Sequence, residues 1–226
     1  SRFFIPPYEI NELFKQCYVI GYKSLPLVGL TGFIMGLVLT MQLRPFMIDY
    51  GVESQLPAIV GIAIIREIGP VITSLIFAGK IGSSIGAELG SMKVTEQIDA
   101  LEIMGINTKS YLILPKILGA FTMVPLLVGI SAVIGIWGGY LVGGWSNSVP
   151  NEVFIDGIRK SLDYNYINIA FYKSFIFAFI ISTVPSYFGY YVKGGALEIG
   201  KAGTLSVVVS CIIILIADYL VASIAI

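Results

Sequence analysis

The chain has 226 residues, of which 56% are hydrophobic and only 12% are charged, and its mean hydropathy is +0.87. These values lie far above those of a soluble domain and indicate an integral membrane protein, while 14 basic residues balanced by 14 acidic residues give no net field to attract nucleic acid. The absence of histidine and the wide separation of Cys17 and Cys211 argue against a metal site, a disulfide framework and histidine-dependent catalysis.

The first predicted element is an amphipathic helix within residues 1–24. From Ile10 to Tyr18 the apolar residues recur at i, i+3, i+4, i+7 and i+8, which places them on one helical face. Such a helix can lie in the membrane interface or pack on the protein itself, and the pattern leaves both alternatives open.

Five apolar runs follow, each long enough to cross a bilayer, which requires about 20 residues. They cover residues 25–43, 56–89, 111–145, 169–192 and 206–226. The second run exceeds this length, so we expect it to tilt, protrude or kink at Pro70. A surface helix is expected at residues 153–162 and a glycine-rich turn at 193–201. The predicted fold is an all-α polytopic membrane protein with one domain, residues 1–226, whose five-span bundle occupies residues 25–226.

Two of the predicted spans carry small residues at intervals of four. In the second span these residues are Ala78, Gly82, Gly86 and Gly90, and in the third they are Ser131, Gly135, Gly139 and Gly143. Stripes of this kind let two helix backbones approach closely. We therefore predict tight helix pairing at both stripes, either within one subunit or across a dimer.

Residues 91–105, between the second and third spans, interrupt the apolar pattern. A narrow apolar stripe is formed by Val94, Ile98 and Leu101, and an acidic stripe by Glu96, Asp99 and Glu102. Gly105 suits the end of a helix. The pattern predicts a short amphipathic helix. Its acidic face is either simply solvated or a contact surface for a basic groove on another protein.

The distribution of basic residues predicts the orientation of the spans. Eight lysines and arginines belong to the N-terminal side, namely Arg2, Lys15, Lys23, Lys93, Lys109, Lys116, Lys193 and Lys201, whereas Arg44, Arg159 and Lys160 belong to the other. The side richer in basic residues is normally cytoplasmic. We therefore predict a cytoplasmic N-terminus, a cytoplasmic helix within residues 91–105 and an external C-terminus.

Four ionisable residues lie deep within the predicted spans: Arg66, Glu67, Lys173 and Asp218. Charged groups are costly against lipid tails, so they should face the bundle interior or a watery cavity. A helical rise of about 1.5 Å per residue puts all four at one level in the outer half of the membrane. They could be buried pairs that fix helix register, a lining for an amphiphile with a charged head group, or a path for protons or ions.

One motif is rejected. Residues 195–202, GALEIGKA, nearly match a phosphate-binding loop, but Ala202 occupies the position that needs a hydroxyl group and no strand precedes the segment. We expect no cofactor and no ATP hydrolysis in this chain. If ATP drives it, a partner must hydrolyse the nucleotide.

The stretch that begins at Arg66, REIGPVITSLIFAGKIGSSIGAELGSMKVTEQIDALEIMGI, resembles the signature of the MlaE-type permeases, the membrane subunits of the Mla and Mce phospholipid ABC transporters. Further similarity lies in IWGGYLVG of the third span, in Lys173 with Ser174, and in the Asp-Tyr-Leu step at Asp218. Lys80 departs from the family pattern, which often has arginine there, and keeps the charge without the bidentate geometry.

The resemblance implies a permease subunit, not an enzyme, that moves phospholipid between the inner membrane and the outer membrane or periplasm. It implies a multi-pass homodimer in the bacterial inner membrane, cytoplasmic ABC ATPase subunits that hold ATP and Mg²⁺, and a periplasmic ring of MlaD-like Mce-domain proteins, with room for a small STAS-type accessory subunit. A proton-coupled secondary transporter using Glu67 and Asp218, and a passive membrane scaffold, are the alternatives.

The resemblance also assigns residues. Residues 91–105 would be a coupling helix whose contacts with the ATPase come from Glu96, Gln97, Asp99 and Glu102. The four intramembrane charges would lie near a lipid cavity. The apolar wall of that cavity would include Leu39, Phe46 and Tyr50.

Overall fold

The computed structural model describes residues 10–145 and 150–224, and within them the regular structure is helical, without strands. The α-helices are α1 (Ile10–Ile20), α2 (Leu25–Asp49), α3 (Leu56–Ala63), α4 (Gly69–Phe77), α5 (Ser83–Val94), α6 (Gln97–Ile103), α7 (Leu114–Trp145), α8 (Asn151–Ser161), α9 (Tyr164–Tyr190) and α10 (Ala196–Ile224). Five helical segments among the described residues are long and apolar enough to cross a membrane. The prediction of an all-α polytopic membrane protein is confirmed.

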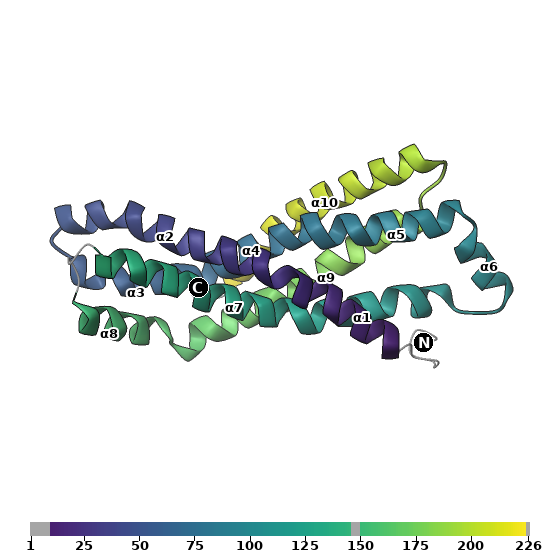
Figure 1. Cartoon of the computed structure of the whole chain (residues 1–226). Coiled ribbons are helices and arrows are strands. Elements are labelled where there is room, and N and C mark those ends of the chain that lie inside the picture. Colours follow the sequence, from purple (N-terminus) through teal and green to yellow (C-terminus); the bar gives the residue numbers. More distant parts are fainter. Residues whose placement is uncertain (1–9, 146–149, 225–226) are drawn as a thin grey trace.

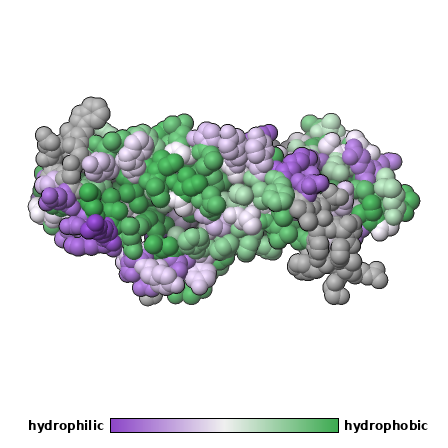
Figure 2. Space-filling model, turned by 60° about the horizontal axis from the view of Figure 1, so that its bottom comes forward, coloured by the Kyte–Doolittle hydropathy of each residue, from purple (hydrophilic) through white to green (hydrophobic). Residues whose placement is uncertain are grey.

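The molecule is an elongated bundle with two distinct ends (Figure 1). The start of α1 and α6 lie at one end, and α8 lies at the other, beside the turn that joins α2 to α3. Figure 2 shows an apolar surface over much of the middle, with hydrophilic residues gathered toward the ends. This distribution is the one expected of a protein whose middle lies in lipid and whose ends lie in water.

The second span is one continuous helical segment, Glu53–Val94, of 42 residues. At about 1.5 Å per residue it is roughly 63 Å long, so it extends beyond a hydrocarbon core of about 30 Å. Two π-helical turns interrupt it, Ile64–Ile68 before Pro70 and Ala78–Gly82 farther along. The irregularity expected at Pro70 thus takes the form of a π turn, in which the Gly69 amide donates to the carbonyl of Ile64.

Both small-residue stripes pack within the subunit, against different partners. Gly135 and Gly139 of α7 face Gly32, Gly36 and Thr40 of α2. Gly86 of α5 faces Gly189 of α9 and Gly203 of α10, while Gly82 lies against Pro185 and Gly90 against Ile199. Gly143 adjoins the ring of Phe154 of α8. Both stripes therefore lie at close helix contacts within one subunit.

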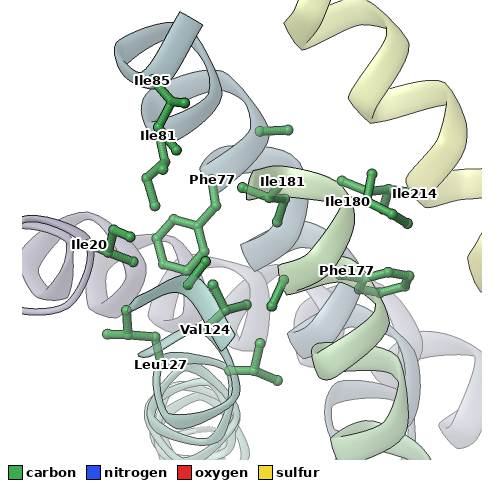
Figure 3. Close-up of a cluster of buried hydrophobic side chains, with 14 of the residues drawn as sticks. Ile20, Phe77, Ile81, Ile85, Val124, Leu127, Phe177, Ile180, Ile181 and Ile214 are labelled. Carbon is green, nitrogen blue, oxygen red and sulfur yellow. The ribbon is translucent and has the colours of Figure 1, made fainter. Parts of the chain in front are cut away.

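The largest apolar cluster forms where the spans converge (Figure 3). Phe77, Leu127 and Phe177 are almost completely buried there, and they come from α4, α7 and α9. Ile20 of α1 and Ile214 of α10 close the cluster from two further directions. This core fixes the lateral order of the helices, and with it the level at which polar side chains on different helices meet.

Helix α1 packs on the protein, one of the two alternatives left open for the N-terminal segment, of which residues 1–9 lie outside the described part; a position in the membrane interface stays a prediction. Its Gln16 and Ile20 are buried, and Gln16 lies beside Gly119 of α7, so the helix packs on the protein. Phe14 and Tyr18, from the predicted apolar stripe, remain exposed. They are available to the surrounding lipid interface.

The segment predicted as one helix, residues 91–105, is instead broken in two. Helix α5 continues to Val94, and α6 begins at Gln97 after Glu96, whose φ of 59° is left-handed. Gly105, with φ 77°, ends α6 as expected, because Gly105 N–H donates to Glu102 O and Ile106 N–H to Leu101 O. The predicted turn at residues 193–201 is likewise too long, since α10 begins at Ala196.

Candidate functional site

The four intramembrane charged residues come together in one ion-pair network. Lys173 of α9 places its Nζ atom 2.5 Å from Glu67 Oε2 and 2.7 Å from Asp218 Oδ1 of α10. Arg66 Nε lies 3.4 Å from Glu67 Oε1. Three membrane helices, carrying the second, fourth and fifth spans, are thus tied at one level. The agreement in depth expected from the sequence is confirmed.

Backbone geometry contributes a further bond to this network. Pro70 has no N–H group, so it cannot donate to the carbonyl of Arg66, four residues earlier. The Lys173 ammonium donates to this oxygen at 3.4 Å. The proline and the π turn beside it therefore expose a backbone acceptor where the lysine charge needs one.

The network is buried on one side and open on the other. The Lys173 side chain is completely buried, whereas 21% of the Asp218 side chain and 40% of the Glu67 side chain remain exposed. A buried ammonium requires its carboxylate partners, since an unpaired charge in an apolar interior is strongly unfavourable. The exposed edges of these carboxylates leave polar groups at the surface of the bundle.

Two apolar hollows lie in the same half of the molecule. One, of about 190 Å³, lies between α7 and α9 and is lined in part by Ile65 and Ser174, the neighbours of Arg66 and Lys173. The other, of about 600 Å³, lies between α2 and α7, with Phe33, Met41 and Arg44 in its lining. Sequence reasoning missed both, because each is made by residues from two helices.

The proposed cavity wall on α2 is divided in the structure. Leu39 packs inside the subunit against Leu56, Val60 and Ile64. Phe46 and Tyr50 are exposed at the far end of the helix. The larger hollow lies on another face of α2, so the assignment of these three residues to a lipid cavity stays a prediction.

Only part of the acidic stripe of α6 is free of contacts within the subunit and available to another protein. Glu96 and Gln97 are exposed. Asp99 forms an ion pair with Lys93 of α5. Glu102 Oε1 accepts hydrogen bonds from Tyr190 Oη of α9 at 2.7 Å and from Thr108 Oγ1 at 3.1 Å. These last contacts, here called the α6–α9 latch, fasten α6 to the end of the fourth span.

The latch depends on the charge of Glu102. The hydrogen bond from Tyr190, together with that from Thr108, lowers the pKa of the Glu102 carboxyl below its ordinary value of 4.5. A carboxyl whose pKa is lower in the folded state stabilises the fold above its unfolded pKa. The latch is therefore complete at neutral pH, and its contribution is lost as the pH falls below 4.5 through the lowered value.

Changing Tyr190→Phe is expected to loosen α6, because it removes the phenol O–H that donates to Glu102. Amide hydrogen exchange in residues 97–106 should become several-fold faster at neutral pH. Tyr191→Phe is the matched control, since Tyr191 is an exposed neighbour. Equal protection of α6 in both variants would contradict the latch.

Comparison with known proteins decides the family. The model of the family described as Permease MlaE matches residues 13–224. This chain belongs to the MlaE permease family. The match covers all five spans, α6 and the four charged residues of the network.

Individual relatives of this MlaE-family permease support the same family assignment. A probable ABC transporter permease protein of Rickettsia bellii is 39% identical over 216 residues, which cover 96% of this chain and 83% of the relative. The intermembrane phospholipid transport system permease protein MlaE of Haemophilus influenzae is 34% identical, over 94% of this chain and 82% of the relative. A probable ABC transporter permease protein of Pyropia yezoensis is 36% identical, over 92% and 80%. The permease is thus a transmembrane transporter component rather than a catalytic chain.

Proposed function

We propose that this permease is the membrane subunit of an ABC transporter that moves phospholipid between the bacterial inner membrane and the periplasm or outer membrane. The observation that carries the proposal is the family match over nearly the whole chain, together with the relative from Haemophilus influenzae whose name states phospholipid transport. The apolar surface over the middle of the molecule (Figure 2), together with the ion-pair network among the membrane helices, suits a substrate with acyl chains and a polar head group.

In this proposal a separate ATPase, which holds ATP and Mg²⁺, supplies the energy. Helix α6 is the coupling helix that the ATPase contacts, and its exposed Glu96 and Gln97 offer an acidic and polar edge. When the ATPase moves α6, the α6–α9 latch transmits this movement to α9. Tyr190 and Lys173 are 17 residues apart on that helix, about 26 Å, so a movement at its cytoplasmic end reaches the ion-pair network.

The arrangement of the assembly is part of the same proposal. The distribution of basic residues favours a cytoplasmic α6 end and a periplasmic α8 end. Two copies form a homodimer, two ATPase subunits bind at the α6 ends, and Mce-domain proteins cover the periplasmic side. A STAS-type subunit would join the ATPase.

Reconstitution tests the function. The permease, its ATPase and its Mce-domain partner are placed in vesicles that contain a fluorescent phospholipid, and transfer to acceptor vesicles is measured. We expect transfer with ATP and Mg²⁺, and none with a non-hydrolysable analogue. Transfer driven by a pH gradient without the ATPase would instead support a proton-coupled transporter using Glu67 and Asp218. Transfer that needs neither the permease nor a gradient would make the chain a scaffold.

The coupling contact has its own test. Glu96→Asn removes the charge and keeps a residue that tolerates the left-handed backbone at this position. We expect the affinity for the ATPase to fall about two- to fivefold, the range for one exposed charge pair. Glu152→Gln, in α8 at the opposite end, is the control and should change nothing. Unchanged association for Glu96→Asn would favour a merely solvated acidic face.

A further inference from the structure

A groove on the α6 half of the molecule is separate from the ion-pair network and the hollows near it. It has a volume of about 310 Å³ and lies between α1 and the helical segment that comprises the second π turn and α5. Its lining combines apolar and charged side chains, among them Lys15 and Ile20 from α1, and Lys80, Ser84 and Glu88 from the facing helix. We propose that this groove binds the head group of an anionic phospholipid in the membrane leaflet at the α6 end.

The charges around the groove leave a positive excess. Lys15 of the lining is matched by an acid, since its Nζ lies 3.3 Å from Glu12, and the lining residue Glu88 is itself paired with the buried Lys116, at 2.6 Å. Lys80 has no acidic partner within ion-pair distance among the described residues, and it contacts only the Lys23 carbonyl, at 2.6 Å, and the Ser24 hydroxyl, at 3.0 Å.

The ammonium group of Lys80 is therefore held in position, with one N–H donor and its positive charge still available. An ammonium carries three N–H donors, and the two neutral acceptors use two of them without neutralising its charge. The side chain is exposed and lines the groove. The exposed Ser84, on the next turn of the same helix, adds a hydroxyl group. A phosphate group placed between them would receive a charge-assisted hydrogen bond and a neutral one.

The depth of the groove suits a lipid rather than a soluble anion. Lys80 bonds the backbone just before Leu25, the first residue of α2, so it lies at the point where the first span begins. Along its own helix it is 14 residues from Arg66, about 21 Å. If the network lies in the opposite half of the membrane, Lys80 lies at the boundary on the α6 side.

The apolar side chains near the groove also favour a lipid over a soluble anion. Ile20 of α1 and Ile81 and Ile85 of the facing helix lie at the base of the groove and continue into the main core (Figure 3). Phe14 and Tyr18 expose apolar area on the nearby α1 helix. A free phosphate ion would gain nothing from these apolar groups, whereas the glycerol and upper acyl segments of a phospholipid could bury apolar surface on the exposed Phe14 and Tyr18. Basic pockets at such a boundary favour anionic head groups.

Native mass spectrometry of the purified permease in detergent tests the site. Phosphatidylglycerol and phosphatidylcholine are added separately, and the bound fraction is measured for each. We expect a preference for phosphatidylglycerol that falls about fivefold in Lys80→Met, the loss expected for one lysine at a membrane surface. Lys80→Arg should retain it, because the charge remains. Lys201→Met removes an exposed lysine paired with Glu198 and is the matched control.

Two further experiments distinguish a lipid site from a site for a soluble anion. Ser84→Leu narrows the groove without removing charge and should also weaken phosphatidylglycerol binding. Inorganic phosphate, added in excess, should not displace the lipid. Displacement by phosphate would assign the site to a soluble anion and overturn the lipid proposal. Equal binding of the two lipids, or equal losses in Lys80→Met and Lys201→Met, would also overturn it. None of these results depends on ATP-driven transfer, so they are independent of the proposed transport function.

Discussion

Replacing Lys173 with methionine is expected to lower the free energy of unfolding by about 3–5 kcal/mol, the usual effect of removing one partner from a buried ion pair. Lys173 is completely buried between Glu67 and Asp218. Without it, Glu67 keeps its contact with Arg66, but Asp218 loses the only ion pair found for it within the described residues. The uncompensated Asp218 carboxylate should therefore account for most of the loss, which thermal unfolding in detergent micelles would measure.

The double variant Lys173→Met with Asp218→Asn separates the charge from the packing. It removes both members of one pair and leaves Glu67 with Arg66. Replacing a whole buried pair is often nearly neutral, so stability should largely return. Transport should stay low in the double variant if the network serves the lipid pathway. Wild-type stability in the single variant would show that Lys173 is not held by these carboxylates.

The second large effect is expected at Gly36, where α2 and α7 cross. A Cβ atom added there would overlap the carbonyl oxygen of Gly135. The obstacle is backbone, which cannot rotate away as a side chain can, so Gly36→Ala must push the two helices apart. We expect a loss of about 3 kcal/mol, at the upper end of the range for overpacking.

Gly129→Ala is the matched control for Gly36→Ala. Gly129 lies on α7, and a Cβ atom there would meet nothing within 4 Å. The change should be neutral or gain up to about 1 kcal/mol, because alanine is the better helix former. If the two variants unfold at the same temperature, close packing of α2 on α7 does not stabilise the protein.

The sequence predicted the elements that depend on a single regular helix. The ion-pair network could be anticipated because helical rise is constant, so distance along each span gives the depth of Arg66, Lys173 and Asp218. The glycine stripe at Gly135 and Gly139 was recognisable for the same reason. Its partner on α2, formed by Gly32, Gly36 and Thr40, has the same four-residue spacing and was overlooked although the signal was present.

Backbone breaks and contacts between distant segments could not be predicted from local sequence patterns. The break between α5 and α6 occurs at Glu96, a non-glycine residue in a left-handed conformation, and no composition signal marks it. Tyr190 lies 88 residues from Glu102, so their hydrogen bond could not be read from local spacing. It changes the meaning of the acidic stripe, since Glu102 holds α6 to α9 whereas Glu96 remains exposed.

In the proposed mechanism, α6 is mechanically coupled to the membrane helices through the α6–α9 latch. The most direct test of this coupling is the amount of phospholipid transferred per ATP hydrolysed by the reconstituted complex, compared between the wild type and Tyr190→Phe. We predict that ATP hydrolysis continues in Tyr190→Phe while transfer per ATP falls several-fold. An unchanged ratio of transfer to hydrolysis would contradict the claim that α9 receives its movement from α6 through Glu102 and Tyr190.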